Sequence, residues 1–358
     1  MVVSLVGKGN MSQPTYDGTQ VSAPFINQYV NITHENIFIT PKSDLTAFYK
    51  VEYQIESLKD GVDLPFIFYA MDYVGEFKIW VDGVKVQVDS VIDVGNKQDF
   101  EYSIDSGDAP SNYINFSFNF RDNEGLYASS ADLKYFIASL SKGKHIIVVE
   151  YYSTVWVDLS DWVKEYSFRY SLSPARKWKS FGPLDVSVDC TEFGEHFVSN
   201  LDSGLVKSDN AKPLISHYHF NKIPADFISL TWIPKVGFFA NALIFIGPFG
   251  LMLILFFGLV YTHFRMVRIY RRNNLYRGIS VVVALGSVLV PFLAMSSLFF
   301  FYPFIDWVIG EQASEYHGYY FFIFVLYPIV WPIYWLCMIG IDRYYKQRFT
   351  EIEKKRNN

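Results

Sequence analysis

Charged side chains are missing from three long stretches of this 358-residue sequence. Residues 236–261, 279–301 and 319–341 contain no Asp, Glu, Lys, Arg or His. Each stretch is longer than the roughly 20 apolar residues that a helix needs to cross the hydrocarbon core of a bilayer. Proton relays, ion-coupled transporters and intramembrane proteases keep ionisable groups in their spans, so this absence argues against those classes. We expect a three-helix transmembrane domain over residues 236–341.

Common enzyme motifs are also missing. The sequence holds neither G-x-S-x-G nor the phosphate-binding pattern G-x-x-x-x-G-K-[ST], and we assign no catalytic or cofactor-binding residue. It has two cysteines, and because Cys337 lies in an apolar run while Cys190 does not, we expect no disulfide between them. Residues 1–235 carry 20 Lys and Arg against 30 Asp and Glu, which argues against nucleic acid as a partner.

Basic residues are absent from the loop of residues 302–318, whereas residues 263–278 contain five arginines and residues 342–358 contain six Lys and Arg. Basic loops stay on the cytoplasmic side of a membrane. The arginine-rich hairpin and a basic tail over residues 342–358 should therefore be cytoplasmic, and everything before residue 236 should lie outside the plasma (inner) membrane. Binding of anionic lipid headgroups is a second, compatible reading of the arginines.

An export signal is not evident at the start of the sequence. The first apolar stretch is only about seven residues long and no basic residue precedes it, unlike a signal peptide. We expect that the chain lacks its signal. The alternative is an inward-facing domain with both basic segments outside, which contradicts the charge rule twice.

Residues 30–235 show the period-two alternation of strands and predict an all-β, antiparallel β-sandwich-like domain. It is one sandwich or two smaller ones that separate near residues 153–162. Asp82-Gly83 between apolar alternations predicts a tight hairpin. Residues 1–29, poor in apolar side chains, are expected to form a flexible arm. The predicted strands are Thr46–Ser57, Glu76–Val88, Tyr113–Phe120, Lys144–Tyr152, Glu165–Ser173, Pro183–Asp189 and Ser216–Phe220.

A single helix is expected in this domain, over Ser130–Gly143. Asp132 can cap its first turn, and Gly143 can end it. The apolar residues at helical spacing are Leu133, Phe136, Ile137 and Leu140.

One pair of side chains could bind a metal. His217 and His219 are two residues apart, so on a strand they point to the same side, and Cys190 with His196 could complete a zinc or copper site. The alternative is a solvated strand face that carries two histidines. The acidic residues at 103–112 and 119–125 do not fit a calcium-binding loop and are read as turns.

Three functions remain open. The leading hypothesis is a non-enzymatic membrane protein that binds lipid with its spans and protein partners through its outer domain and helices, as a binding or structural subunit of an envelope assembly. The second is a channel or transport subunit, in which the spans line a conduit after oligomerisation. The third is a metal-binding protein built on His217 and His219.

Overall fold

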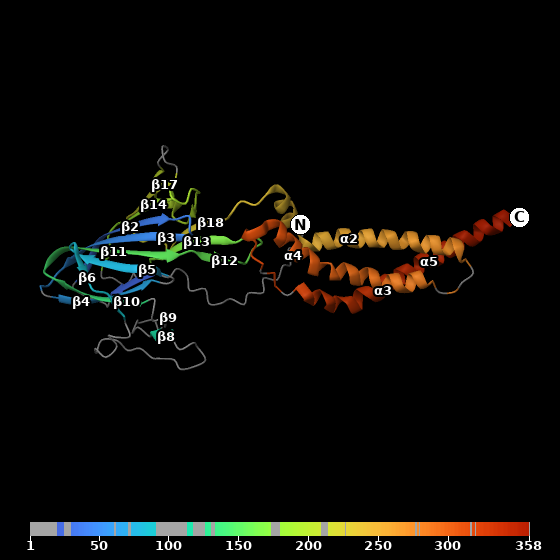
Figure 1. Ribbon diagram of the computed structural model, residues 1–358, viewed down its shortest axis with the longest axis horizontal. Helices are drawn as coiled ribbons and strands as arrows, with labels where there is room; N and C mark the ends of the chain where they lie inside the picture. Colours follow the sequence, from blue (N-terminus) through green and yellow to red (C-terminus); the bar gives the residue numbers. More distant parts are fainter. Residues whose placement is uncertain are drawn as a thin grey trace. The chain divides into compact units, whose positions relative to one another are not determined.

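The fold is described by a computed structural model, whose elements are labelled in Figure 1. The described residues form two compact units. One unit is rich in sheet and ends at Trp232, and the other comprises Asp158–Lys164 and the chain from Ile233. The structure describes residues 20–24, 30–60, 62–70, 73–90, 113–116, 126–129, 133–172, 180–208, 214–225, 227–275, 278, 280–315, 317–318 and 320–357.

The sheet unit contains one short 3₁₀ helix, η3 (Asp202–Gly204), among its described strands. Its strands are β1 (Gln20–Pro24), β2 (Val30–Pro41), β3 (Thr46–Ser57), β4 (Val62–Ala70), β5 (Tyr73–Val81), β6 (Val84–Val86), β7 (Asp89–Ser90), β8 (Tyr113–Phe116), β9 (Leu126–Ser129), β10 (Leu133–Leu140), β11 (Gly143–Thr154), β12 (Trp156–Asp158), β13 (Glu165–Ser171), β14 (Leu184–Asp189), β15 (Val198–Ser199), β16 (Leu205–Ser208), β17 (Ile215–Phe220) and β18 (Phe227–Trp232).

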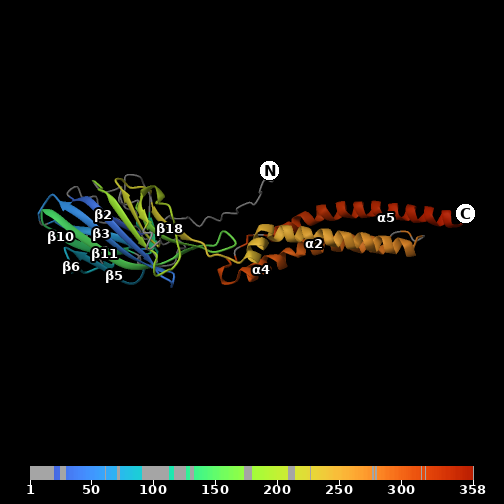
Figure 2. The ribbon, with the colours of Figure 1, turned by 90° about the horizontal axis from the view of Figure 1, so that it is seen from above.

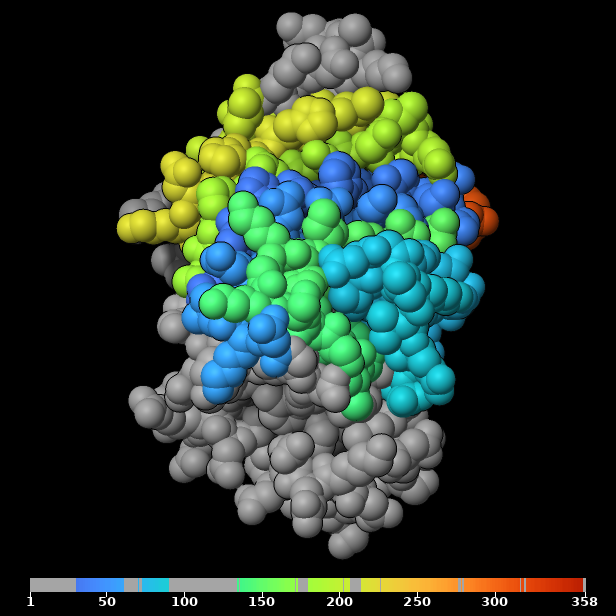
Figure 3. Space-filling model, turned by 90° about the vertical axis from the view of Figure 1, so that its left-hand side faces the viewer, coloured from blue at the N-terminus to red at the C-terminus, as the bar shows by residue number. Residues whose placement is uncertain are grey.

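An eight-stranded sheet, in the order β16-β17-β14-β2-β3-β11-β5-β6, is the largest element of this unit. Its long strands lie side by side in Figures 1 and 2, and Figure 3 shows them as bands from yellow-green through blue and green to cyan. Strands from both halves of the predicted domain share this sheet. Among the strand pairs with a described register, only β14 and β2 run parallel, so the sheet is not purely antiparallel as predicted.

Three smaller sheets complete the unit, in the orders β1-β4-β10-β7, β12-β13-β18-β15 and β8-β9. The period-two pattern explains the packing, because every second residue of β3 is buried. Val51 of β3, Phe136 of β10 and Phe168 of β13 belong to one apolar core cluster, so three of the sheets bury their inner faces together. The strand order of the eight-stranded sheet is open, with β16 and β6 as its end strands.

Two sequence-based expectations are wrong here. Residues Leu133–Leu140 form strand β10 and not a helix, because Phe136, Ala138 and Leu140 are buried in alternation while β10 pairs with β4 along its length. Within the predicted flexible arm, Gln20–Pro24 form β1, which also pairs with β4. The rest of that arm, and the acidic segments at 103–112 and 119–125, lie outside the described residues.

The predicted hairpin is confirmed. Asp82 and Gly83 connect β5 to β6, with φ of 50° and 79°. Two positive φ angles define the primed turn whose twist matches the flanking strands, and Gly and Asp tolerate that conformation.

The second unit contains three helical segments that are long and apolar enough to cross a membrane. The helix α2 is not continuous, because Gly247 has φ 67° and ψ 166° inside it and Pro248 follows. Proline excludes the preceding residue from helical angles, and glycine is the residue that can adopt these ones. The helices are α2 (Phe238–Asn273), α3 (Val281–Ser296), α4 (Leu298–Ile309), η4 (Gly310–Gln312), η5 (Tyr320–Leu326) and α5 (Tyr327–Asn357).

All three helical segments extend beyond the uncharged runs at one end or both. The arginine-rich hairpin is largely helical, since α2 continues to Asn273, and the basic tail continues α5 to Asn357. A small core forms among α2, α3 and α5 around Val267, Val283 and Met338. Most of the remaining helix surface is apolar and exposed.

Candidate functional site

The histidines predicted to bind metal are on strand β17, and each has a partner on the adjacent strand β14. His219 Nδ1 lies 2.7 Å from Asp185 Oδ1, and His217 Nδ1 lies 2.9 Å from Ser187 Oγ. These are the residues directly opposite in the register of the two strands. The hydrogen bond with Asp185 raises the pKa of His219.

A third histidine joins this surface cluster from strand β2. His34 Nε2 lies 2.7 Å from Asp185 Oδ2 and 3.0 Å from Asn36 Oδ1. The Asp185 carboxylate therefore bridges the imidazoles of His34 and His219. It reaches His34 because β2, which carries this residue, pairs in parallel with β14. His34 could not be predicted to join this cluster, because it is far from His219 along the chain.

The other two proposed metal ligands do not complete a site. Burial raises the pKa of the Cys190 thiol to about 12, so the thiol keeps its proton, and His196 is exposed. Over the described residues, no group of three or more His, Cys, Asp or Glu is arranged to hold a metal ion.

Glu35 is a buried acid in the core of the sheet unit, with 2% of its surface exposed. The hydroxyl of Tyr170 donates to Glu35 Oε1 at 3.1 Å, and the hydroxyls of Tyr53 and Tyr170 are 2.8 Å apart. Burial raises the pKa of Glu35 to about 7, although the two tyrosine hydrogen bonds lower it. The stacked rings of Tyr49 and Tyr151, with centroids 5.2 Å apart, lie in the same core.

A β-bulge turns Glu35 inward. The register between β2 and β3 shifts between Ile32 and His34, so the buried positions of β2 change from even numbers (30, 32) to odd numbers (35, 37, 39). Gly182 allows this bulge, because a Cβ at that position would overlap the backbone carbonyl of Thr33. Strict alternation from Val30 would have placed Glu35 on the outer face.

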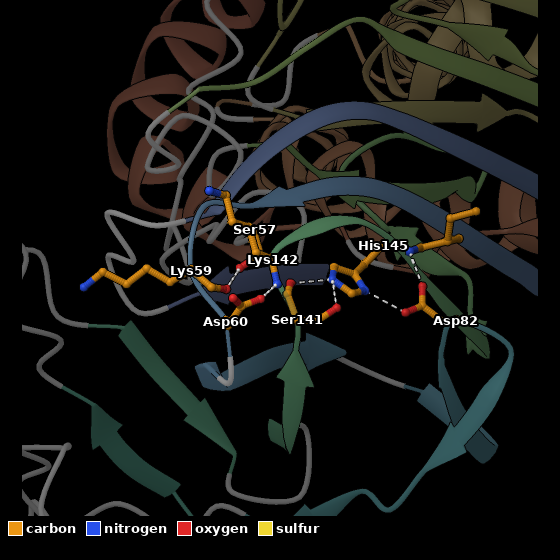
Figure 4. A network of polar contacts seen from close by, with 8 residues as sticks. Ser57, Lys59, Asp60, Asp82, Ser141, Lys142 and His145 are labelled. Atoms are coloured by element: carbon orange, nitrogen blue, oxygen red, sulfur yellow. Dashed lines mark hydrogen bonds and ion pairs between the residues drawn. The ribbon is translucent and has the colours of Figure 1, made fainter.

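A polar network surrounds the Asp82 turn (Figure 4). His145 Nδ1 lies 2.6 Å from Asp82 Oδ2 and His145 Nε2 lies 2.7 Å from the Ser141 carbonyl, while the Ile146 N–H donates to Asp82 Oδ1. Because both ring nitrogens face acceptors, the geometry suits the doubly protonated imidazolium. Burial opposes that charge, but the bonds to Asp82 and Ser141 raise the pKa of His145 above its ordinary value. Asp60 accepts the Lys142 N–H at 2.6 Å in the same region.

In the helical unit, Asp158–Lys164 forms a short two-stranded contact with the loop after α4. The Lys164 N–H donates to the Gln312 carbonyl at 2.9 Å, and the Ser314 N–H donates to the Trp162 carbonyl at 3.1 Å. The chain on both sides of Asp158–Lys164 belongs to the sheet unit, so this segment is an excursion into the helical unit.

Aromatic rings pack against this excursion, and one of them is the hydrogen-bonded ring of His317. The ring centroid of His317 is 4.5 Å from that of Trp162 and 5.0 Å from that of Tyr302. His317 Nε2 lies 2.5 Å from Asp306 Oδ2, and the other oxygen of Asp306, Oδ1, is buried with no hydrogen-bond partner among the described residues. The loop that carries His317 was expected to lie outside the membrane.

Two polar contacts connect α2 to α5. His263 Nδ1 lies 2.9 Å from the Tyr334 hydroxyl. Arg271, which is 1% exposed, donates from Nε to Asp342 Oδ1 at 2.6 Å and from Nη2 to the Gly278 carbonyl at 2.8 Å. Both contacts join residues 71 apart in sequence, so the two helices run in the same direction.

His263, Arg271 and Asp342 were not recognised as buried because they lie just beyond the uncharged runs, whereas Tyr334 lies within the third run. The sequence ends the first run at residue 261 and the third at residue 341, whereas both helices continue. The signal that could have found them is the repeated spacing of eight residues, His263 to Arg271 and Tyr334 to Asp342.

Comparisons with known proteins give little further information. No family model and no curated protein matches the chain. Solved structures with some similarity include mutant M1 zinc metallopeptidases: one from Deinococcus radiodurans with a Tyr-Ser-Ala substrate (7% identity, TM-score 0.29, covering 57% of this chain and 42% of that one) and a two-domain enzyme with L-arginine (7%, 0.28, 57% and 43%). The chain spans less than half the length of these proteins. Likeness at this level carries no argument about activity.

Proposed function

We propose that the protein is a non-enzymatic integral membrane protein that presents a β-sandwich outside the cell and serves as a binding or structural subunit of a larger envelope assembly. The observation that carries this proposal is the apolar exposed surface of the helical unit. In the first and in the third candidate span, only 11% of the most apolar stretch of 18 residues is buried. Such a surface needs lipid or partner helices to cover it.

The charge distribution supports the orientation. The arginines of α2 beyond Tyr261 and the basic residues of α5 are at one end of their helices, while the loop of residues 302–318 has no Lys or Arg. The positive-inside rule then assigns the helix ends at Asn273 and Asn357 to the cytoplasm and the sheet unit to the outside.

The polar clusters of the sheet unit support a binding or structural role over catalysis. His217, His219 and His145 each have a hydrogen-bond partner from a neighbouring strand or turn, and Glu35 is hydrogen-bonded in the core. These contacts connect strands to one another, as structural polar groups do.

Labelling of single cysteines tests the orientation. In a chain carrying Cys190→Ala and Cys337→Ser, Val84→Cys on the sheet unit and Arg272→Cys on α2 both lie at exposed positions. We expect a membrane-impermeant maleimide to label Val84→Cys in intact cells, and Arg272→Cys only after permeabilisation. The reverse pattern would invert the topology, and equal labelling at both positions without permeabilisation would contradict membrane insertion.

Purification in mild detergent tests the assembly. We expect stoichiometric partner proteins by mass spectrometry. Phe257 and Leu336 are both more than 60% exposed on the helical unit. If partner helices bind at these two residues, replacing both by Ala should release the partner proteins. A protein that purifies alone and monomeric under the same conditions would contradict the subunit role.

A further inference from the structure

The first nine residues of α2 depart from the direction of the rest of the helix. The helix is broken at Gly247 and Pro248, and Figure 1 shows its first turns leaving the line of the labelled part. Residues 236–261 were predicted to form one span, but the break divides them into Phe238–Ile246 and a second segment from Pro248.

The segment Phe238–Ile246 has one buried face and one exposed face. Ala240 and Leu243 are buried. The opposite face exposes Phe238 (90%) and Phe245 (92%), which are seven residues apart and so lie on the same side of the helix. An amphipathic helix that lies alone at a membrane interface has a polar face opposite its apolar face. In this segment, the face opposite Phe238 and Phe245 is instead buried within the protein.

Helix length decides where the span begins. A hydrocarbon core of about 30 Å accommodates about 20 helical residues at 1.5 Å each. Counted from Phe238, those residues end at Phe257 and leave five further uncharged residues before His263 in the headgroup region or beyond. Counted from Pro248, they end at Val267, between Arg265 and Arg268. The second count places the charges where the hydrocarbon ends.

We infer that Phe238–Ile246 is a surface-seated helix that inserts Phe238 and Phe245 into the acyl-chain boundary of the outer leaflet, and that the transmembrane part of α2 begins at Pro248. The partner of this exposed apolar face is lipid. Phe249 and Leu253, at the start of the span itself, also expose apolar side chains, and no charged residue lies between Val236 and Tyr261. The inference rests on the proposed membrane insertion.

Depth measurements on the reconstituted full chain test this inference. Single nitroxide labels are placed at Phe238, Phe245, Leu253, Phe257 and Tyr261, all exposed positions, in the Cys190→Ala, Cys337→Ser background. Collision rates with oxygen and with a water-soluble nickel chelate, in vesicles of phosphatidylethanolamine and phosphatidylglycerol, give the depth of each label. We expect equal, shallow depths at 238 and 245 and a maximum near 257, about 13 Å deeper than 245.

The outcomes separate the alternatives. A maximum between 245 and 253 would show one continuous span from Phe238 and overturn the inference while leaving membrane insertion intact. Low collision rates with both reagents at 238 and 245 would show a protein partner on this face and would also overturn it. Water-like collision rates at 257 would contradict membrane insertion itself.

A double variant tests the cause of the break. Gly247→Ala with Pro248→Ala removes both the proline and the residue that adopts φ 67°, and a Cβ at 247 has open space around it. We expect the label at 245 to move deeper and the maximum to shift toward the start of α2. Unchanged depths in this variant would show that the break does not determine where the helix enters the bilayer.

Discussion

Glu35 and His145 are buried ionisable groups of the sheet unit whose protonated forms are favoured by the fold for opposite reasons. Burial in the apolar core favours the neutral form of Glu35 and outweighs the two tyrosine hydrogen bonds, which lower its pKa. His145 faces a carboxylate and a carbonyl oxygen, so its charged form is favoured. Both pKa values are therefore raised, and both groups should make the fold less stable as the pH rises.

Replacement of Glu35 by Gln should remove part of this pH dependence. The pKa of Glu35 is raised to about 7 from its ordinary value of 4.5, so the wild type loses stability as the pH rises from about 4.5 through 7. Glutamine keeps an acceptor for Tyr170 and carries no charge. We expect Glu35→Gln to be more stable than the wild type by about 3 kcal/mol at pH 8 and to differ little at pH 4.5.

Denaturant unfolding of the full chain in detergent, followed by near-UV circular dichroism between pH 4.5 and 8, measures this difference. Glu52→Gln on the neighbouring strand β3 is the control, because it makes the same substitution at a partly exposed position. A Glu35→Gln difference that does not change with pH would contradict the assignment of a neutral buried carboxyl.

Asp82→Asn should weaken the fold while keeping the turn. Asparagine tolerates the positive φ of residue 82, but an amide is a poorer partner for the His145 imidazolium. We expect a loss of about 1–2 kcal/mol, modest because Asp82 is half-exposed, and a lower pKa of His145 by NMR. The loss should be largest below pH 6.5 and should shrink as the pH rises through the raised pKa of His145. An unchanged His145 titration would contradict the ion pair.

The sequence predicts some residues of these clusters and not others, for identifiable reasons. Asp82-Gly83 is a local signal, so the turn could be predicted. The pair His217 and His219 could be placed on one strand, but Asp185 and His34 could not be added, because strand pairing between distant segments determines those contacts. Glu35 lies at an odd-numbered position of β2, like the buried residues Ile37 and Ile39. Val30 and Ile32 are buried at even-numbered positions, because the bulge between Ile32 and His34 shifts the alternation.

At the scale of elements, strand β3 could be predicted with its full bounds because its alternation is uninterrupted. Strand β10 was mistaken for a helix because Leu133, Phe136 and Leu140 also fit helical spacing. Pairing with β4 decides in favour of the strand, with Ile137 and Ser139 on the exposed side. Tertiary pairing can override local spacing in this way.

Gly286 controls how closely α3 approaches α2. A Cβ at this position would overlap the His263 ring, whereas a Cβ at Gly258 would meet nothing within 4 Å. We expect Gly286→Ala to lower the thermal stability of the detergent-purified chain by several degrees and to break the His263–Tyr334 contact, at a cost of about 1–3 kcal/mol. Gly258→Ala should leave stability unchanged. Equal effects of the two variants would contradict close packing at Gly286.

At the scale of the whole molecule, the described part of the chain passes between its two units three times, after Val157, after Lys164 and after Trp232. An anchor built only from the last connection would need no excursion by Asp158–Lys164. The excursion places Trp162 against His317 and Tyr302 within the helical unit. The segment Asp158–Lys164 is therefore part of the helical unit, although residues 158–162 were expected to lie at the possible break between two sandwiches.

Trp162→Ala should release this segment. The substitution removes the packing of an indole ring against two others, which costs about 2–4 kcal/mol in the helical unit. We expect a lower melting temperature and faster proteolysis between residues 158 and 164 in the full chain. Asp161→Ala, at the exposed neighbouring position, should have neither effect. If both variants are cleaved at the wild-type rate, the ring contacts do not hold the segment.

The parallel register of α2 and α5 limits how this sequence can diverge. Two contacts, His263–Tyr334 and Arg271–Asp342, join residues with the same separation in sequence. The two helices are therefore held in one parallel register. Insertions in the connections between α2, α3, α4 and α5 leave the eight-residue spacings within α2 and α5 unchanged, so both contacts are kept. A single inserted or deleted residue between 263 and 271 alone would rotate Arg271 by about 100° away from Asp342. Descendants of this chain should therefore vary in loop length far more readily than in that eight-residue interval.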